Sequence, residues 1–143
     1  MDIFNQQKIK KIDIKKVRNY LKKIFFYLSI ESKKASFVLS DNRFIIGLNK
    51  KYFSKNTPTD VISFNLADEI EPDYLGEVVV SVEEAAAAAK ELKTDWQAEL
   101  LLYLIHGILH LIGFEDATAA QRKKMEKRQR EIFLKFKKIK LNQ

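Results

Sequence analysis

The chain contains no cysteine. Disulfide bonds and thiolate zinc sites are therefore excluded, and any metal must be held by histidine, aspartate or glutamate. The longest apolar run, residues 100–112, is shorter than the ~20 residues that cross a bilayer. Residues 1–5 lack the basic segment and apolar run of a signal peptide. We therefore expect a cytoplasmic protein with no membrane partner.

The formal net charge of +7 is distributed unevenly along the chain. Residues 1–55 carry 14 Lys or Arg and 4 Asp or Glu, residues 56–116 carry 2 and 13, and residues 117–143 carry 10 and 2. Basic ends suit a polyanionic partner such as nucleic acid, and the acidic middle segment offers carboxylates to a metal. The alternative is that the lysines only solvate two amphipathic helices. The sequence leaves both interpretations open.

The two histidines of the chain, His106 and His110, lie four residues apart in an apolar segment. On a helix this spacing places both imidazoles on one face, where they can bind one metal ion. Gly113 is typical of a helix C-cap, and the chain can then fold back to bring Asp116 as a third ligand. Alternatively, both histidines are hydrogen-bonded core residues. That alternative is disfavoured because burying two imidazoles without a shared ligand is costly.

Gly107 stands where the zinc-protease motif His-Glu-x-x-His has its catalytic glutamate. A peptidase of that type would therefore lack its general base. A glycine inside a helix costs about 1 kcal/mol relative to alanine, which indicates that another group approaches the backbone closely. The candidates for a base elsewhere are Glu115, Asp60 and Glu77, acidic residues within or near the motifs.

The remaining patterns predict one α+β domain over residues 1–143. Capping boxes at Ser81, Thr94 and Thr118 predict three helix starts. The predicted elements are an amphipathic helix at 13–30, a hairpin of strands 35–40 and 43–49, a loop or single helical turn at 50–59, strands 60–64 and 76–81 around an exposed acidic loop at 67–74, and helices 82–92, 95–112 and 118–137. The helix at 95–112 is apolar nearly all round and should be the central buried helix.

Three ordered motifs resemble one known family. The segment His106-Gly107-Ile108-Leu109-His110-Leu111-Ile112-Gly113-Phe114 is similar to the signature His-Gly-x-Leu-His-Leu-x-Gly-Tyr/Phe of the YbeY family. Residues 58–64 resemble its Pro-Thr-Asp-Val-Leu-Ser-Phe strand, and residues 75–81 its Leu-Gly-Asp-Ile-x-Ile-Ser strand. Leu48-Asn49 followed by Tyr52 also matches, so the resemblance covers roughly residues 35–135.

The resemblance implies a metal-dependent, single-strand-specific endoribonuclease of rRNA maturation and ribosome quality control. It implies a small mixed four-stranded sheet with about four to five helices, and zincin-like metal ligands on one helix. The ligands would be His106 and His110, with Asp116 where the family usually has a third histidine. Zinc is the expected ion, although the added negative charge of Asp116 leaves the metal identity open. The expected partners are single-stranded rRNA and the ribosome or a ribosomal protein, and no DNA.

Many family members have an arginine directly after the tyrosine, where this chain has Phe53. Lys50, Lys51 or Lys55 would then supply the charge that contacts RNA. Phe64 and Phe114 lie within the motifs and could stack on a base, but core packing is the favoured role. The two departures from the family, Asp116 for a third histidine and Phe53 for the arginine, favour an alternative function. This alternative is a non-catalytic ribosome-assembly factor that binds RNA or a ribosomal protein and keeps a structural metal. A metallopeptidase is the third possibility.

Overall fold

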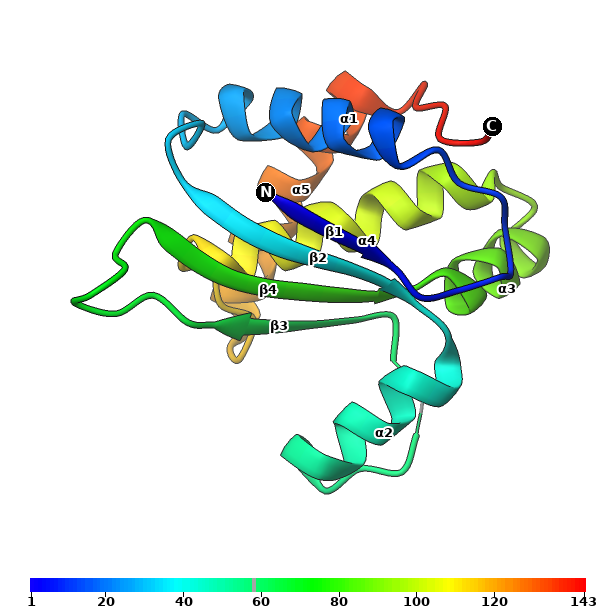
Figure 1. The fold of residues 1–143 in the computed structure, drawn as a ribbon, viewed down its shortest axis with the longest axis horizontal. Helices are drawn as coiled ribbons and strands as arrows, with labels where there is room; N and C mark the ends of the chain where they lie inside the picture. The colour runs from blue at the N-terminus through cyan, green and yellow to red at the C-terminus, as the bar shows by residue number, and fades with distance from the viewer. Residues whose placement is uncertain (58) are drawn as a thin grey trace.

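The computed structural model describes residues 1–57 and 59–143, and these form a layered α+β fold (Figure 1). Its elements, in chain order, are β1 (Asp2–Asn5), α1 (Ile14–Tyr27), β2 (Lys34–Ser40), α2 (Asn42–Phe53), β3 (Val61–Asn65), β4 (Tyr74–Ser81), α3 (Val82–Leu92), α4 (Trp96–Leu111) and α5 (Ala119–Phe136). The predicted α+β class is confirmed.

The four strands form one mixed sheet in the order β1-β2-β4-β3. β1, β2 and β4 are parallel, and β3 is antiparallel to β4. The register places Ser63 opposite Val78, and Val78 beside Phe37. Because side chains alternate along a strand, Ser63, Val78 and Phe37 share one face of the sheet, and this is the face that carries the functional site.

The two faces of the sheet are covered unequally. α1, α4 and α5 lie on one side of the sheet, and α2 projects on the other (Figure 1). Val78 and Val80 belong to the main core with Ile105 and Ile108 of α4, which are fully buried. On the opposite face a small core joins Ile62 and Val79 to Ile45 of α2, with Val38. α4 is therefore the central buried helix, as predicted.

The predicted hairpin is wrong in its second strand. Residues 35–40 are strand β2, but residues 43–49 lie in helix α2, which runs on to Phe53 through the first part of the predicted loop. Asp41 caps this helix by accepting the Phe44 N–H at 2.9 Å. Ile45 and Asn49, one turn apart, are its buried residues. The helix is therefore stabilised by its cap and by burial of one narrow face, whereas the apolar run Phe44-Ile45-Ile46 alone is typical of a strand. The prediction also missed the short edge strand β1.

The three helices predicted from capping boxes are confirmed within about one residue. At α5 both halves of the box are formed, because Thr118 and Gln121 accept each other's backbone N–H. Ser81 accepts the Glu84 N–H at the start of α3. At α4 the cap is Asp95 rather than Thr94, and the Thr94 hydroxyl donates to Glu99 instead.

The acidic loop at 67–73 is exposed as predicted. Pro58, the first residue of the second motif, lies outside the described residues. Among residues 1–57 and 59–143, no helix has the length and apolarity needed to cross a membrane.

Candidate metal centre

α4 places both imidazoles on one half-buried face, where the rings of His106 and His110 meet edge to face with centres 4.7 Å apart. The Nε2 atoms of His106 and His110 lie 3.1 Å apart. Their side chains are 32% and 26% exposed, so the rings are anchored in the protein but open to a ligand. The helical spacing of four residues therefore produces the geometry that it predicts.

The second nitrogen of each ring is held by an oxygen acceptor. His106 Nδ1 lies 3.0 Å from the side-chain oxygen of Gln129 on α5. His110 Nδ1 lies 3.0 Å from the backbone carbonyl of Phe114. A carbonyl oxygen can only accept, so each Nδ1 carries the proton and each Nε2 presents its lone pair. Both rings are thus fixed in the tautomer that binds a metal through Nε2.

The end of α4 explains how Asp116 reaches these rings. Gly113 adopts φ +105°, which favours glycine. Its N–H donates to the His110 carbonyl at 3.2 Å, and the Phe114 N–H donates to the Leu109 carbonyl at 3.0 Å. This is the Schellman pattern of helix termination. It turns the chain back, so that Asp116 Oδ2 lies 3.4 Å from His110 Nε2 and 3.8 Å from His106 Nε2.

The donor set of His106, His110 and Asp116 fits a divalent cation. The two Nε2 atoms lie 3.1 Å apart, and Asp116 Oδ2 lies 3.4 Å from His110 Nε2 and 3.8 Å from His106 Nε2. One cation placed between these three atoms could therefore be bound by all of them. Ligands of a tetrahedral ion with bonds of about 2.0–2.2 Å are separated by roughly 3.4 Å. With both Nδ1 atoms bonded to oxygens of the protein, a shared cation would remove the repulsion between the two Nε2 lone pairs. The hydrogen-bonded alternative instead requires an extra proton between the two Nε2 atoms, beside the Asp116 carboxylate.

Gly107 is the point at which α4 packs against the sheet. A Cβ atom built on it would lie 2.4 Å from Val78 Cγ1 and 3.2 Å from Ser63 Oγ. Ser63 Oγ donates to the Gly107 carbonyl at 3.1 Å. The close backbone approach that the sequence predicts is confirmed, and the approaching groups come from β4 and β3. The absence of a side chain at Gly107 thus lets α4, which carries both histidines, pack closely on the sheet.

A cleft of about 660 Å³ opens beside the three candidate ligands. His106, His110 and Asp116 form one wall, which we call the ligand wall. The opposite wall, called the α2–β3 wall here, comes from the end of α2 and the segment that leads into β3. The α2–β3 wall contributes Asn49, Phe53, Lys55, Thr57, Thr59 and Asp60.

The structure separates the three candidate bases. Asp60 lines the cleft, and its carboxylate accepts from Thr59 Oγ1 at 3.4 Å. Glu115 borders a smaller hollow beside His110 and accepts from Gln121 Nε2 at 3.0 Å. Glu77 pairs with Phe64 on the strand register and alternates with Val78, so its side chain belongs to the face of the sheet that α2 covers.

The three candidate lysines are also separated. Lys55 lines the cleft, just after Ser54 ends α2 in the left-handed conformation. Lys50 and Lys51 lie in the last turn of α2 and do not line the cleft. Lys51 Nζ instead lies 5.2 Å from the centre of the Tyr52 ring. Of the predicted cations, Lys55 is the one that can face a substrate bound beside the ligands.

The aromatic residues of the motifs pack at the edges of the two cores. Phe114 contacts the main core, and Phe64 contacts the small core. Phe64 also makes edge and stacked contacts with Tyr52 and Phe53, with ring centres 5.2 and 6.5 Å apart. Phe53 itself is 48% exposed in the cleft, so it is the aromatic side chain most available to a ligand there.

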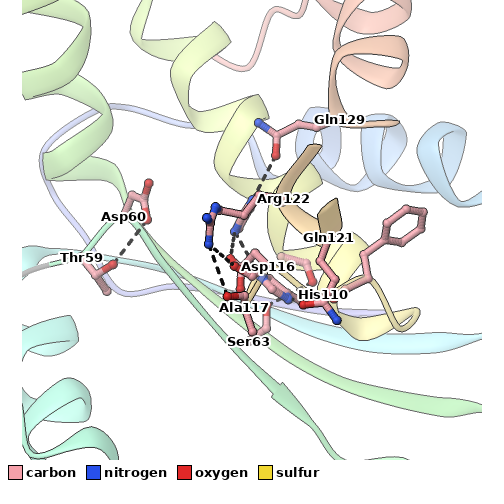
Figure 2. A network of polar contacts seen from close by, with 12 residues as sticks. Thr59, Asp60, Ser63, His110, Asp116, Ala117, Gln121, Arg122 and Gln129 are labelled. Atoms are coloured by element: carbon pink, nitrogen blue, oxygen red, sulfur yellow. Dashed lines mark hydrogen bonds and ion pairs between the residues drawn. The ribbon is translucent and has the colours of Figure 1, made fainter. Parts of the chain in front are cut away.

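Sequence reasoning missed the residues that support the ligands. Gln129 orients His106, Ser63 ties β3 to Gly107, and Arg122 Nη1 donates to the Asp116 carbonyl at 3.2 Å. Figure 2 shows Arg122 directed at Asp116 and Ala117, whose carbonyls accept from its Nη1 atom, with Gln129 on the same side of the site. Gln129 lies 23 residues after His106, and no local spacing signals such a contact.

Tyr103 links the two sides of the cleft electrostatically. It lies on α4, one turn before His106. Burial and then the nearby charge of Asp60, with smaller effects from Glu99 and Glu84, raise the pKa of Tyr103 to about 12. Both causes disfavour the phenolate, so Tyr103 should lose its proton only at a more alkaline pH than an exposed tyrosine does.

The fold and the site define a class of protein, namely α+β proteins in which two histidines of one helix and a carboxylate just after it meet at an open cleft. A family model described as Endoribonuclease YbeY matches residues 2–137. The chain therefore belongs to the YbeY family of endoribonucleases, and the family predicted from the motifs is confirmed.

Individual relatives agree with this assignment. The chain is 34% identical over 137 residues to Endoribonuclease YbeY of Syntrophus aciditrophicus, covering 92% of this chain and 86% of the relative. It is 44% identical over 96 residues to that of Carboxydothermus hydrogenoformans, covering 64% and 67%. A solution structure of a Thermotoga maritima protein matches with a TM-score of 0.63 at 27% identity, covering 96% of this chain and 93% of that one.

Proposed function

We propose that this chain hydrolyses single-stranded RNA as a metal-dependent endoribonuclease in rRNA maturation and ribosome quality control. Its substrate would be rRNA in the cytoplasm, with the ribosome or a ribosomal protein as partner. The observation that carries the proposal is the convergence of His106 Nε2, His110 Nε2 and Asp116 Oδ2 at the wall of an open cleft. The chain's membership of an endoribonuclease family supports the same reaction.

His106, His110 and Asp116 would hold the ion, for which zinc is our first choice. When bound, such an ion polarises a phosphodiester oxygen and lowers the pKa of a coordinated water. Gln129 and the Phe114 carbonyl keep both rings in the metal-binding tautomer. Arg122 restrains the backbone of Asp116, so the chain itself fixes the position of the third ligand.

Asp60 is our choice for the general base. It is the one of the three acidic candidates that lines the cleft with the ligands. It lies at the start of β3, where its own carbonyl accepts the Ser81 N–H at 2.9 Å and fixes the backbone. An ionised carboxylate on the wall opposite the ligands can accept a proton from an attacking water in the cleft.

The α2–β3 wall would bind the RNA strand. Lys55 offers a cation to a phosphate, and the exposed ring of Phe53 offers a surface to an unstacked base. Asn49 Nδ2 donates to the Thr57 carbonyl at 2.9 Å and holds the segment beyond α2 in place. Such contacts require splayed bases, which single strands present and duplexes do not.

A second candidate is a ribosome-assembly factor that keeps metal for structure alone. Phe53, which stands where many family members have an arginine, favours this alternative because the cleft loses one cation. The nuclease should lose RNA cleavage when it loses its metal, whereas the assembly factor should not cleave RNA with or without metal. They are separated by measuring bound metal and RNA cleavage in the same samples.

The test compares wild type with His110→Ala and Asp60→Asn. Metal content is measured by elemental analysis of the purified proteins, and cleavage with a labelled single-stranded RNA. We expect His110→Ala to lose metal and cleavage together, and Asp60→Asn to keep metal while cleavage falls about a hundredfold or more. Cleavage at the wild-type rate by metal-free His110→Ala would defeat the nuclease proposal. RNA affinity that does not change with salt would defeat RNA binding.

A further inference from the structure

A second basic hollow lies between α1 and α5, outside the cleft. This surface, called the α1–α5 groove here, encloses about 590 Å³ and is lined by Lys22, Lys23, Phe26, Tyr27, Lys135 and Phe136. The rings of Tyr27 and Phe136 meet edge to face with centres 6.1 Å apart. This contact joins the C-terminal turn of α1 to that of α5 and forms the floor of the groove. The groove shares no lining residue with the cleft.

The surroundings of the groove are strongly basic. α1 carries five Lys or Arg and no acidic residue, and residues 119–143 carry ten Lys or Arg and two acidic residues. Arg128 Cζ and Lys135 Nζ lie 5.3 and 5.2 Å from the centre of the Tyr27 ring. Lys23 Nζ lies 5.3 Å from that of Tyr20. Arg128, Lys135 and Lys23 therefore lie within cation–π distance of tyrosine rings in or beside the groove.

The C-terminal segment extends this surface along α1. Lys16 Nζ donates to the Asn142 carbonyl at 2.9 Å, and the Lys140 N–H donates to the Tyr20 hydroxyl at 3.3 Å. Figure 1 shows this segment, in red, running beside the blue helix α1. The two basic ends of the sequence therefore fold into one continuous positive face.

Phe26 is the feature that a merely solvated lysine face does not explain. Its side chain is 71% exposed on α1. It borders the α1–α5 groove and also a neighbouring hollow that contains Lys33 and Lys34. The second hollow also contains Glu31, and its Lys33 pairs with Asp73 at 2.9 Å, so free positive charge is greater on the side of the α1–α5 groove. An aromatic ring left in water between the two hollows forgoes the favourable free energy of burial. A stacked nucleobase would cover that ring while the lysines contact its phosphates.

α5 connects the groove to the metal centre. Gln129 bonds to His106, and its neighbour Arg128 lies over Tyr27 of the groove. Arg122, near the start of the helix, bonds to the Asp116 carbonyl. From Arg122 to Lys135 the helix rises about 20 Å. A single strand several nucleotides long can therefore follow one helix from the cleft to the groove.

We propose that the α1–α5 groove is a second binding surface for single-stranded RNA, engaging the part of the strand that extends beyond the cleft. The proposal rests on the proposed function in that RNA is the substrate. Positive charge suits the phosphates, and the exposed and half-buried rings suit unstacked bases. A flat anionic membrane suits the groove less well. Among its lining residues Phe26 is the one strongly exposed ring, whereas Tyr27 and Phe136 are only partly exposed, so the groove offers no broad apolar face to insert.

The experiment compares wild type with the triple variant Lys22→Glu/Lys23→Glu/Phe26→Ala. All three side chains are exposed, so the variant should fold, which circular dichroism checks. Lys90→Glu/Lys93→Glu/Leu92→Ala on α3 is the matched control, because it makes the same charge change and removes an apolar side chain that is 63% exposed. Affinity for labelled single-stranded RNA is measured by fluorescence anisotropy in EDTA, with strands of about 6 and about 20 nucleotides.

We expect the triple variant to bind the long strand about tenfold more weakly than wild type, with a smaller salt dependence, and to bind the short strand normally. The control should bind both strands as wild type does. Equal affinity of the triple variant and wild type for the long strand would overturn the proposal. Unchanged RNA affinity with lost binding to phosphatidylglycerol vesicles would assign the groove to a membrane instead. Cleavage is measured separately, with added zinc in place of EDTA. Wild type that binds the short strand but does not cleave it in that assay would defeat the nuclease function and leave the groove proposal standing.

Discussion

The two walls of the cleft are built differently. On the ligand wall, each histidine ring is only partly exposed and has its Nδ1 bonded to an oxygen of the protein. On the α2–β3 wall, Phe53 and Lys55 extend from the end of a helix and are exposed. The two histidines that would hold the metal are therefore preorganised, whereas the side chains that would bind a strand can adapt to it.

The difference follows from how each wall is packed. α4 is buried along most of its length between the sheet and α5, with Leu104, Ile105 and Ile108 at most 2% exposed. Each such side chain contributes about 1.5–3 kcal/mol on burial. α2 buries only Ile45 and Asn49. Local opening should therefore be easier at the α2–β3 wall than at the ligand wall.

The largest expected effect follows from changing Asp116 on the ligand wall. Asp116→Asn removes the carboxylate that lies 3.4 Å from His110 Nε2. We expect metal affinity to fall more than about a hundredfold. This loss exceeds the roughly 10- to 100-fold that follows when a residue supporting a ligand is removed, because Asp116 would itself be a ligand. Competition with a calibrated chelator measures this affinity. Asp116→His, which provides a third imidazole, should retain tight binding. Equal affinity of Asp116→Asn and wild type would show that Asp116 is not a ligand.

A smaller loss should follow from releasing His106. Gln129→Leu removes the oxygen that bonds to His106 Nδ1, while Gln129→Glu keeps an acceptor there. We expect about a 10- to 100-fold loss of metal affinity for the leucine variant and little loss for the glutamate variant. The same chelator competition provides the measurement. Similar losses in both variants would indicate that Gln129 acts through packing alone.

The packing of the ligand wall is tested by Gly107→Ala. Its Cβ would lie 2.4 Å from Val78 Cγ1, so β4 or α4 must shift, and we expect a cost of about 1–3 kcal/mol in the free energy of unfolding. Gly47→Ala is the control, because no atom lies within 4 Å of its added Cβ in helix α2. It should stabilise by about 0.5–1 kcal/mol. Urea denaturation measures both, and equal effects would refute the close packing at Gly107.

Features of the ligand wall that depend on local sequence can be predicted without the structure. The position of α4, the facing of His106 and His110, and the turn at Gly113 depend on helical periodicity and a local backbone conformation, so spacing alone predicts them. The close approach at Gly107 is likewise visible as an unfavourable residue in a helix. The family resemblance adds the function and the mixed sheet, neither of which follows from the periodicity.

Other parts depend on contacts between distant segments. The run Phe44-Ile45-Ile46 looks like a strand, and only the cap at Asp41 and the packing of Ile45 on the far face of the sheet make it helical. Gln129 and Ser63 support the site across large sequence separations. Ser63 lies within the family motif at 58–64, but the motif does not reveal its partner Gly107. No local signal marks Gln129, because an amphipathic helix contains such polar residues routinely.

A modest effect is expected at the adaptable wall. Phe53→Ala removes the exposed ring in the cleft. We expect KM for single-stranded RNA to rise about three- to tenfold through lost stacking, with kcat and metal affinity unchanged. Phe44→Ala is the matched control, since that ring is 39% exposed on the same helix but does not line the cleft. A fall in kcat instead of a rise in KM would place Phe53 among the groups that act in the chemical step.

The smallest effect concerns Tyr103, which lies on α4 and senses Asp60 on the opposite wall. Its pKa is about 12, raised mainly by burial and next by Asp60. Between pH 10 and pH 12 the unfolded chain therefore binds fewer protons at this residue than the folded chain, and stability falls as pH rises. Tyr103→Phe should make that fall shallower. The phenolate absorbance of wild type minus Tyr103→Phe gives the titration, and Asp60→Asn should lower its midpoint. An equal Tyr103 midpoint in wild type and Asp60→Asn would show that the two walls are not coupled through this pair.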